Sequence, residues 1–187
     1  MDCDDRPGMR ANVIERQLLS MLDTLRGVST TSNVRALRDS VVALSSSADA
    51  LDESDPQQRA VRRLYDYLEA TTLDALAEGA ASQHPERIEI ENALASVLAA
   101  SRRGGSVYAL SCVRDDLEQL TVRIDELKPD DREPLRSLLS YVDAKNRQAL
   151  ELAIRRDWGT STMVRRLDGA RDDRPDGLGE QKPSIAR

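Results

Sequence analysis

Apolar residues recur at alternating spacings of three and four along much of this 187-residue chain, and this spacing restricts the folds that it can adopt. The clearest run comprises Leu110, Val113, Leu117, Leu120, Ile124 and Leu127. A second run comprises Val34, Leu37, Val41, Leu44, Ala48 and Leu51. Because a helix brings residues three and four apart onto one face, each run predicts an α-helix with a coiled-coil-like heptad seam.

Glycine and proline divide the chain into six such segments. The predicted helices cover residues 9–26, 32–51, 55–79, 84–104, 110–128 and 130–158. Gly27 is a C-terminal stop, Asp55-Pro56 is an N-terminal start, and Pro129 separates the last two helices. Short connections favour antiparallel neighbours, so the expected fold is an all-α antiparallel bundle of about six helices.

The helical pattern is weaker in two places. Within residues 32–51, which begin at Ser32 or Asn33, three serines at 45–47 compete for local backbone hydrogen bonds. After Gly159 the helical pattern fails, and residues 171–187 are rich in Asp, Arg, Gly and Pro. Residues 159–187 are therefore predicted to be a largely disordered tail, with one more short helical turn over residues 160–167 left open. With residues 1–8 as a flexible N-terminus, the bundle domain is residues 9–158. A division into halves at 9–79 and 84–158 is the alternative.

The composition is consistent with helix packing and limits the classes of partner. Phe is absent and aromatic residues make up only 3%, so the core must consist mainly of Leu, Val, Ile and Ala. A net charge of −6 opposes an electrostatic grip on nucleic acid or on an anionic membrane. No apolar run reaches membrane-spanning length, and the first residues do not resemble a signal peptide. The expected location is cytoplasmic, with export by a signal-less route left open.

No constellation of residues is typical of catalysis or of metal binding. His84 is the one histidine; it shares no helical face with Glu86, and no second histidine or cysteine completes a site. Cys3 and Cys112 are far apart and form no CxxC motif. We therefore expect no catalytic residue, no cofactor and no metal, and we interpret Cys112 as a solvated thiol.

Charged and aromatic residues near position 160 form the most distinctive local cluster. Arg155, Arg156, Arg165 and Arg166 lie where acidic residues are relatively sparse, so they form a candidate basic patch. Trp158 lies between the two pairs, at the predicted boundary of bundle and tail. The favoured interpretation of Trp158 is a lid that closes the end of the core, and the alternative is an interface anchor.

The expected function is that of a non-enzymatic protein–protein interaction module, such as an adaptor, an assembly component or a regulatory binding protein. Strict seams are often completed by another chain, so a protein partner, a homo-oligomer or both are expected. The candidate interface residues are Leu110, Leu117, Ile124, Val34, Val41 and Trp158. Nucleic acid is disfavoured as a partner, but a nucleic-acid-associated regulator using the 155–166 basic segment is the alternative. No small-molecule substrate is evident, and a helical enzyme is the third hypothesis.

Overall fold

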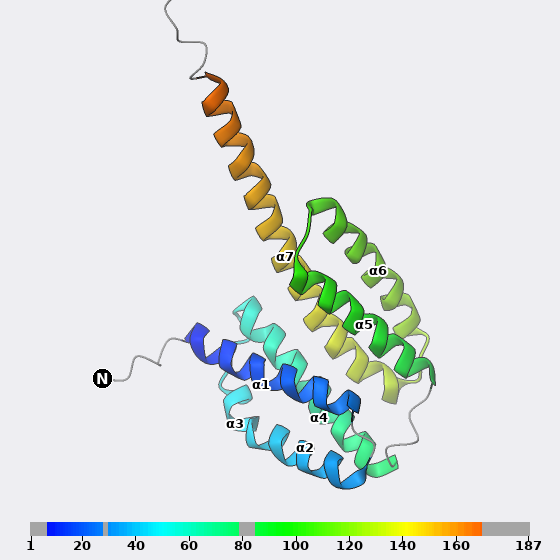
Figure 1. The fold of residues 1–187 in the computed structure, drawn as a ribbon. Helices are drawn as coiled ribbons and strands as arrows, with labels where there is room; N and C mark the ends of the chain where they lie inside the picture. Colours follow the sequence, from blue (N-terminus) through cyan, green and yellow to red (C-terminus); the bar gives the residue numbers. More distant parts are fainter. Residues whose placement is uncertain (1–6, 28–29, 79–84, 170–187) are drawn as a thin grey trace, which may run out of the picture.

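The computed structural model describes the backbone of residues 7–27, 30–78 and 85–169, and the side chains of residues 10–27, 30–77 and 85–158. These ranges form an all-α bundle with seven helices and no strand (Figure 1). The helices are α1 Pro7–Gly27, α2 Thr31–Ala43, α3 Ser45–Asp49, α4 Pro56–Glu78, α5 Pro85–Arg103, α6 Val107–Asp125 and α7 Pro129–Gly169. The predicted all-α helical bundle is confirmed.

Short polar side chains cap the N-terminal ends of α2 and α4. The Thr30 hydroxyl accepts a hydrogen bond from the Asn33 backbone N–H at 3.4 Å, so the N-cap of α2 is Thr30 rather than Ser32 or Asn33. A carboxylate oxygen of Asp55 accepts from the Gln57 backbone N–H at 2.8 Å immediately before α4. The predicted start of this helix is confirmed.

The predicted helix over residues 32–51 is divided at Leu44. α2 ends at Ala43, and the short helix α3 begins at Ser45. The division coincides with the three serines that weaken the helical pattern, because serine hydroxyls compete for backbone hydrogen bonds. Ala48 and Leu51 remain buried beyond it, so the apolar face continues through the break.

Helices α4 and α7 pack along each other at the centre of the bundle. α1 and α2 pack on α4, whereas α5 and α6 pack on α7 (Figure 1). Both predicted seams therefore face helices of the same chain: the seam of α2 faces α4 and α1, and the seam of α6 faces α5 and α7. One apolar core joins α1, α2 and α4 to α5, α6 and α7. Its members include Leu18, Leu64, Leu68, Ile90, Leu94, Ile124 and Leu135.

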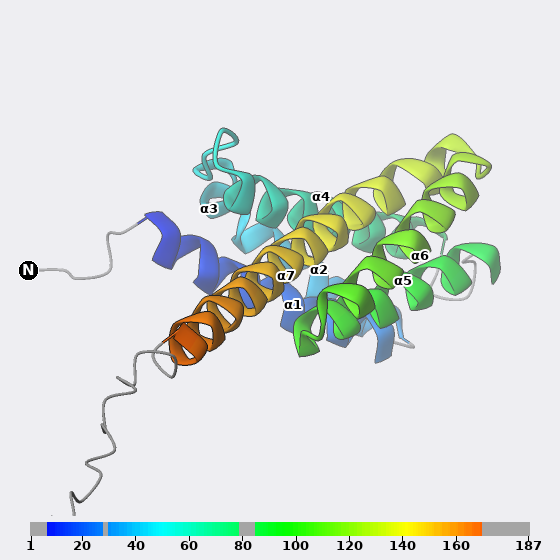
Figure 2. The same ribbon diagram turned by 90° about the horizontal axis from the view of Figure 1, so that it is seen from above.

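Helix α7 extends well past the helices that pack on it. It contains 41 residues, whereas α5 and α6 contain 19 each. Figure 2 shows it running lengthwise through the molecule and out at one end. We call residues 151–169 the arm. The prediction that the helix ends at Trp158 is wrong, because α7 continues to Gly169; residues 170–187 of the predicted tail lie outside the described residues.

Candidate functional site

Most of the predicted interface residues form the core of the folded chain. Val34, Val41, Leu110, Leu117 and Ile124 are each at most 3% exposed. They are buried against helices of their own chain, which complete the seams. Since these side chains are occupied by the fold, a contact surface must be found elsewhere on the molecule.

The sixth predicted interface residue lies on the arm. Trp158 is 75% exposed, so the interpretation as a lid over the core is wrong. Leu152, at 60%, and Ile154, at 38%, are also exposed on this part of α7. Ile154 and Trp158 are four residues apart and therefore lie on one face of the helix, whereas Leu152 lies on another. The arm thus carries apolar side chains on two faces.

Two grooves flank the base of the arm. The first, which we call the α4 groove, has a volume of about 720 Å³ and is lined by Pro56, Arg59, Ala60, Ala144, Arg147 and Glu151, among others. Its charged side chains are largely satisfied within the molecule. Arg59 donates to the backbone oxygen of Glu53 at 2.7 Å, and Arg147 pairs with Asp143 at 2.6 Å.

The second groove lies between α1, the C-terminal end of α5 and α7. We call it the α1 groove; it has a volume of about 490 Å³, and its lining includes Arg16, Leu19, Arg102, Lys145, Ala149 and Leu152. Lys145, Ala149 and Leu152 are spaced four and three apart, so they form one continuous strip along α7. Because Leu152 belongs to the arm, this groove continues onto the arm.

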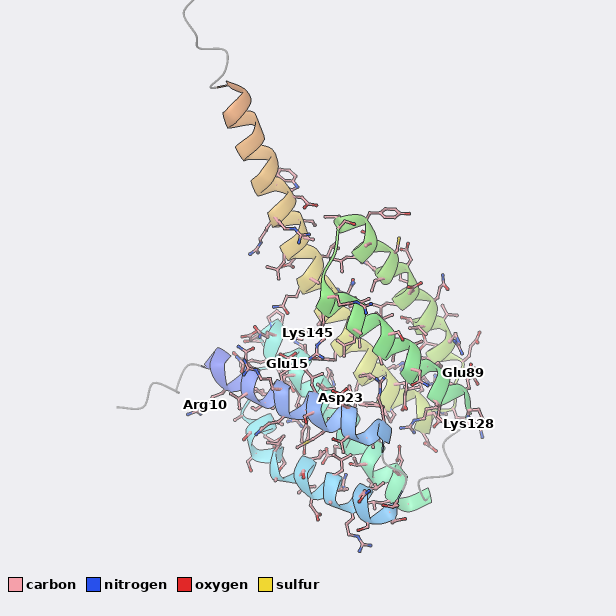
Figure 3. The ribbon with its side chains drawn as sticks, in the orientation of Figure 1. Arg10, Glu15, Asp23, Glu89, Lys128 and Lys145 are labelled. Atoms are coloured by element: carbon pink, nitrogen blue, oxygen red, sulfur yellow. The ribbon has the colours of Figure 1, made fainter. Side chains whose placement is uncertain are left out.

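A hydrogen-bonded ion pair closes the inner side of the α1 groove. The Lys145 ammonium lies 2.5 Å from a carboxylate oxygen of Glu15, and the Tyr141 hydroxyl donates to the same oxygen at 2.7 Å. Figure 3 shows Glu15 on α1 and Lys145 on α7 lying side by side. Burial, followed by the negative charge of Glu15, raises the pKa of Tyr141 well above 10.0, and Arg102 offsets this in part. Tyr141 is therefore a fixed neutral donor at neutral pH.

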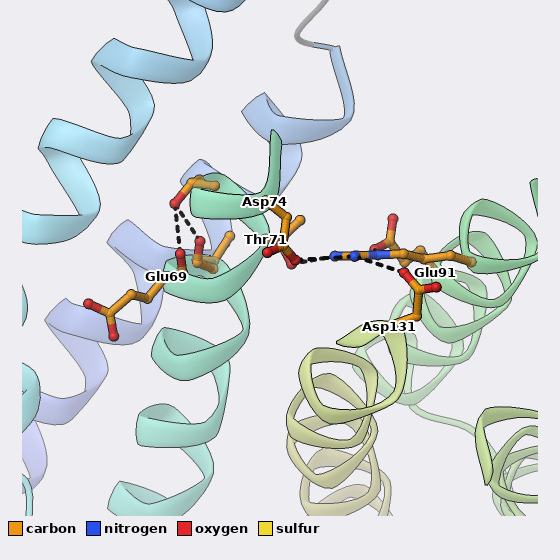
Figure 4. Close-up of polar contacts among 8 residues, drawn as sticks. Glu69, Thr71, Asp74, Glu91 and Asp131 are labelled. Atoms are coloured by element: carbon orange, nitrogen blue, oxygen red, sulfur yellow. Dashed lines mark hydrogen bonds and ion pairs between the residues drawn. The ribbon is translucent and has the colours of Figure 1, made fainter. Parts of the chain in front are cut away.

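The opposite end of the bundle is held by a buried arginine that no sequence motif indicates. Arg87 is 4% exposed and contacts Thr71 at 3.1 Å, Asp74 at 3.3 Å, Glu91 at 3.1 Å and Asp131 at 3.3 Å. Figure 4 shows these partners converging from α4, α5 and α7. We call these five residues the Arg87 network. Burial lowers the pKa of Arg87, but the charge of Glu91 and its hydrogen bond outweigh this, and the net pKa is raised.

The one cation of the Arg87 network is enclosed by three carboxylates, those of Asp74, Glu91 and Asp131. Asp74 is partly exposed and also lines a pocket of about 390 Å³. The buried Tyr67 lies beside the network, and burial, followed by the negative charge of Glu91, raises the pKa of Tyr67 well above 10.0. The network therefore joins three helices, α4, α5 and α7.

A buried amide joins α7 to α5 and α6. Asn146 is 0% exposed, and its side-chain nitrogen donates to the Ser101 hydroxyl at 3.4 Å and to the Leu110 backbone oxygen at 3.3 Å. Its side-chain oxygen has no hydrogen-bond partner. Ser101 in turn donates to the backbone oxygen of Val97 at 3.0 Å, so it can only accept from Asn146.

The candidate basic patch is only partly described. Arg155 and Arg156 are exposed on the arm, whereas the side chains of Arg165 and Arg166 lie outside the described residues. Glu151 lies 3.9 Å from Arg155, and Asp157 lies 3.7 Å from Arg156. Arg156 also donates to the backbone oxygen of Gly105 at 2.6 Å, where the chain passes from α5 to α6. The described arginines therefore have acidic neighbours, which reduces the positive potential they present.

Four carboxylates, those of Asp66, Asp74, Asp130 and Glu133, line a pocket of about 390 Å³ between α4 and the start of α7. Among the described residues, no group of three or more His, Cys, Asp or Glu is placed to hold a metal ion. Cys112 is a free, exposed thiol, as predicted, and His84 lies outside the described residues. No helix in the described part of the chain is both long enough and apolar enough to cross a membrane.

Known proteins provide no further information about this site. No protein-family model, no curated protein and no solved structure matches the chain. The arm and its two grooves are thus the features of the molecule from which a function can be inferred.

Proposed function

We propose that this protein is a non-enzymatic protein-binding module and that the arm of α7 is its main contact surface. The single observation that supports this best is the exposure of Leu152, Ile154 and Trp158 within seven residues at the start of the arm. Isolated helices are marginally stable in water, and most of their stability in proteins comes from packing of an apolar face. A protein partner would supply that packing.

The chemistry of the arm favours a protein over nucleic acid. Trp and Arg are enriched among the residues that dominate protein–protein binding energies, and here Trp158 follows Arg155 and Arg156. Nucleic-acid binding requires basic residues that converge with few acidic neighbours, whereas Glu151 and Asp157 flank these arginines. The net charge of −6 also disfavours nucleic acid.

The proposal is tested by capture with paired variants of the full chain. The arm variant is Ile154→Glu/Trp158→Glu, and the control is Val42→Glu/Val122→Glu, which places the same charges at exposed apolar positions on α2 and α6. Proteins captured by the wild type are identified, purified and titrated against each variant. We expect the arm variant to lose binding and the control to keep it.

The fluorescence of the sole tryptophan provides a direct reading of the contact. Trp158 is exposed in the free chain, so its emission should shift to shorter wavelength when a purified partner covers it. Equal binding by the arm variant and the wild type would refute the proposal. Binding only to DNA or RNA, weakening steeply with salt, would favour the nucleic-acid alternative instead.

Self-association is a separate part of the proposal. A homo-oligomer was expected from the seams, but the chain itself covers those seams, and we infer that a second copy would use the arm. Light scattering at several concentrations and two salt levels distinguishes the cases. A mass that rises with concentration in the wild type, and not in the arm variant, would identify a second copy as the partner.

A further inference from the structure

We propose that the α1 groove at the base of the arm binds an acidic amphipathic helix of the partner protein. This inference deepens the proposed function and rests on it, because the groove continues onto the arm through Leu152. It adds the chemistry and the secondary structure of the partner segment.

The charge of the groove is the first support. Arg16 and Arg102 line it, and no ion pair or hydrogen bond engages either guanidinium in the described part of the chain. Lys145 and Glu15 also line it, but they neutralise each other at 2.5 Å. The groove therefore carries two uncompensated positive charges on a protein whose net charge is −6. Complementary carboxylates on a partner would be steered to it.

The apolar floor of the groove is the second support. Leu19 lies on the α1 side, and Ala149 and Leu152 lie on the α7 side. Leu152 is 60% exposed although it lies next to a packed bundle, so it retains much apolar surface to bury. A segment with apolar residues on one face and carboxylates along its edges would satisfy both the floor and the guanidinium groups.

The shape of the groove favours a helix over a small anion. Arg16 and Arg102 are themselves exposed, and Leu152 stands on the open arm, so a small ligand would leave most of this surface in water. A helix laid against α7 would bury Leu152 and present carboxylates to the two arginines. Helix-in-groove binding of this kind uses apolar residues at spacings of three, four and seven.

The test uses fluorescein-labelled 18-residue amphipathic peptides and the full-length protein. One peptide contains Leu and Glu, and the other contains Leu and Lys in the same pattern; anisotropy measures binding at two salt levels. The groove variant is Arg16→Glu/Arg102→Glu, and a third variant is Leu152→Asp. The control is Arg35→Glu/Arg103→Glu, which changes the net charge equally at two exposed arginines outside the groove.

We expect the Leu/Glu peptide to bind the wild type and the control within about twofold of each other. The groove variant should weaken binding by about tenfold or more, because like charges then oppose each other, and Leu152→Asp should also weaken it. Circular dichroism checks that each variant remains helical. Added salt should weaken the charge-dependent part of the binding.

The inference would be overturned by no binding of the Leu/Glu peptide at low salt, by equal binding of the Leu/Lys peptide, or by equal losses in the groove and control variants. A mass of the wild type above one chain that falls in the groove variant would assign the groove to a second copy and would also overturn it. Failure here is distinguishable from failure of the proposed function. A captured partner lost by the arm variant and kept by the groove variant would leave protein binding intact and reject only the acidic helix.

Discussion

Helix α7 consists of two halves with opposite surroundings. In residues 129–150, Leu135, Leu138, Tyr141, Val142 and Asn146 are each at most 2% exposed. In the arm, Leu152, Ile154 and Trp158 are exposed. The backbone is helical throughout, so the secondary structure does not explain this contrast.

The difference lies in the lengths of the neighbouring helices. α5 ends at Arg103 and α6 begins at Val107, and Arg156 of the arm donates to Gly105 in the turn between them. Leu152, Ile154 and Trp158 lie near or past this turn, and their side chains are exposed. The comparison teaches that an apolar residue on this helix is buried or exposed according to where α5 and α6 stop.

The largest expected effect comes from a substitution in the buried half of α7, residues 129–150. Leu135 is 0% exposed, so Leu135→Ala removes buried methyl groups and leaves a cavity. We expect the free energy of unfolding to fall by about 4 kcal/mol. Urea denaturation measures it, with Leu152→Ala on the arm as the matched control, which should change stability by less than about 0.5 kcal/mol. Equal effects of the two substitutions would remove the contrast between the halves.

The next largest effect concerns the Arg87 network, which holds the start of α7 against α4 and α5. Arg87→Met leaves Glu91 and Asp131, whose side chains are 16% and 14% exposed, without their cation. We expect a loss of about 3 kcal/mol in the free energy of unfolding, because carboxylates become buried without a counter-charge. The comparison is Arg136→Met, which removes an exposed arginine of α7 and should have little effect on stability. A neutral Arg87→Met would show that the Arg87 network does not hold α7.

A smaller effect should appear only at alkaline pH. In the unfolded chain a tyrosine ionises near pH 10.0, whereas burial raises the pKa of Tyr141 above this value in the folded chain. Above pH 10 the unfolded chain therefore binds fewer protons, and stability falls as pH rises. Between pH 10 and 11 the loss is about 1 kcal/mol for each such tyrosine. Tyr141→Phe should remove one such loss, measured as the urea midpoint against pH; an unchanged slope would contradict the assignment.

The last prediction changes no residue and tests directly whether the arm is exposed in the free protein, through the fluorescence of Trp158. Since Trp158 is 75% exposed, acrylamide should quench its emission in the folded chain nearly as well as in urea. Quenching should be independent of protein concentration if the arm is uncovered in the free protein. Strong protection that increases with concentration would show that copies of the chain cover the arm themselves.

The sequence predicts the helices well because the relevant signal is local. Val34, Val41, Leu117 and Ile124 repeat at helical spacings, and each of them is buried in the structure. The same spacing cannot identify the surface that covers a seam, because it reports only that one face is apolar. That limit explains why residues predicted for an interface lie in the core instead.

The parts that escaped prediction depend on contacts between distant segments. Arg87 and Glu91 resemble an ordinary surface pair four residues apart, and only the fold brings Asp74 and Asp131 to the same guanidinium. The interpretation of Trp158 as a lid came from its position at the predicted boundary of bundle and tail, whereas the helix continues past it and the side chain is exposed. Gly159 weakens a helix by about 1 kcal/mol relative to alanine, which is too little to end one.

Asn146 fixes the register of α7 against α5 and α6, although its side-chain oxygen is left without a hydrogen-bond partner. Its two hydrogen bonds form only when α7 is aligned with both Ser101 and Leu110. If α7 slid by one heptad against its neighbours, the amide would lose both acceptors and Asp131 would leave Arg87. Such a slip would lengthen or shorten the arm by about 10 Å. The buried amide and the Arg87 network thus set how far this protein reaches.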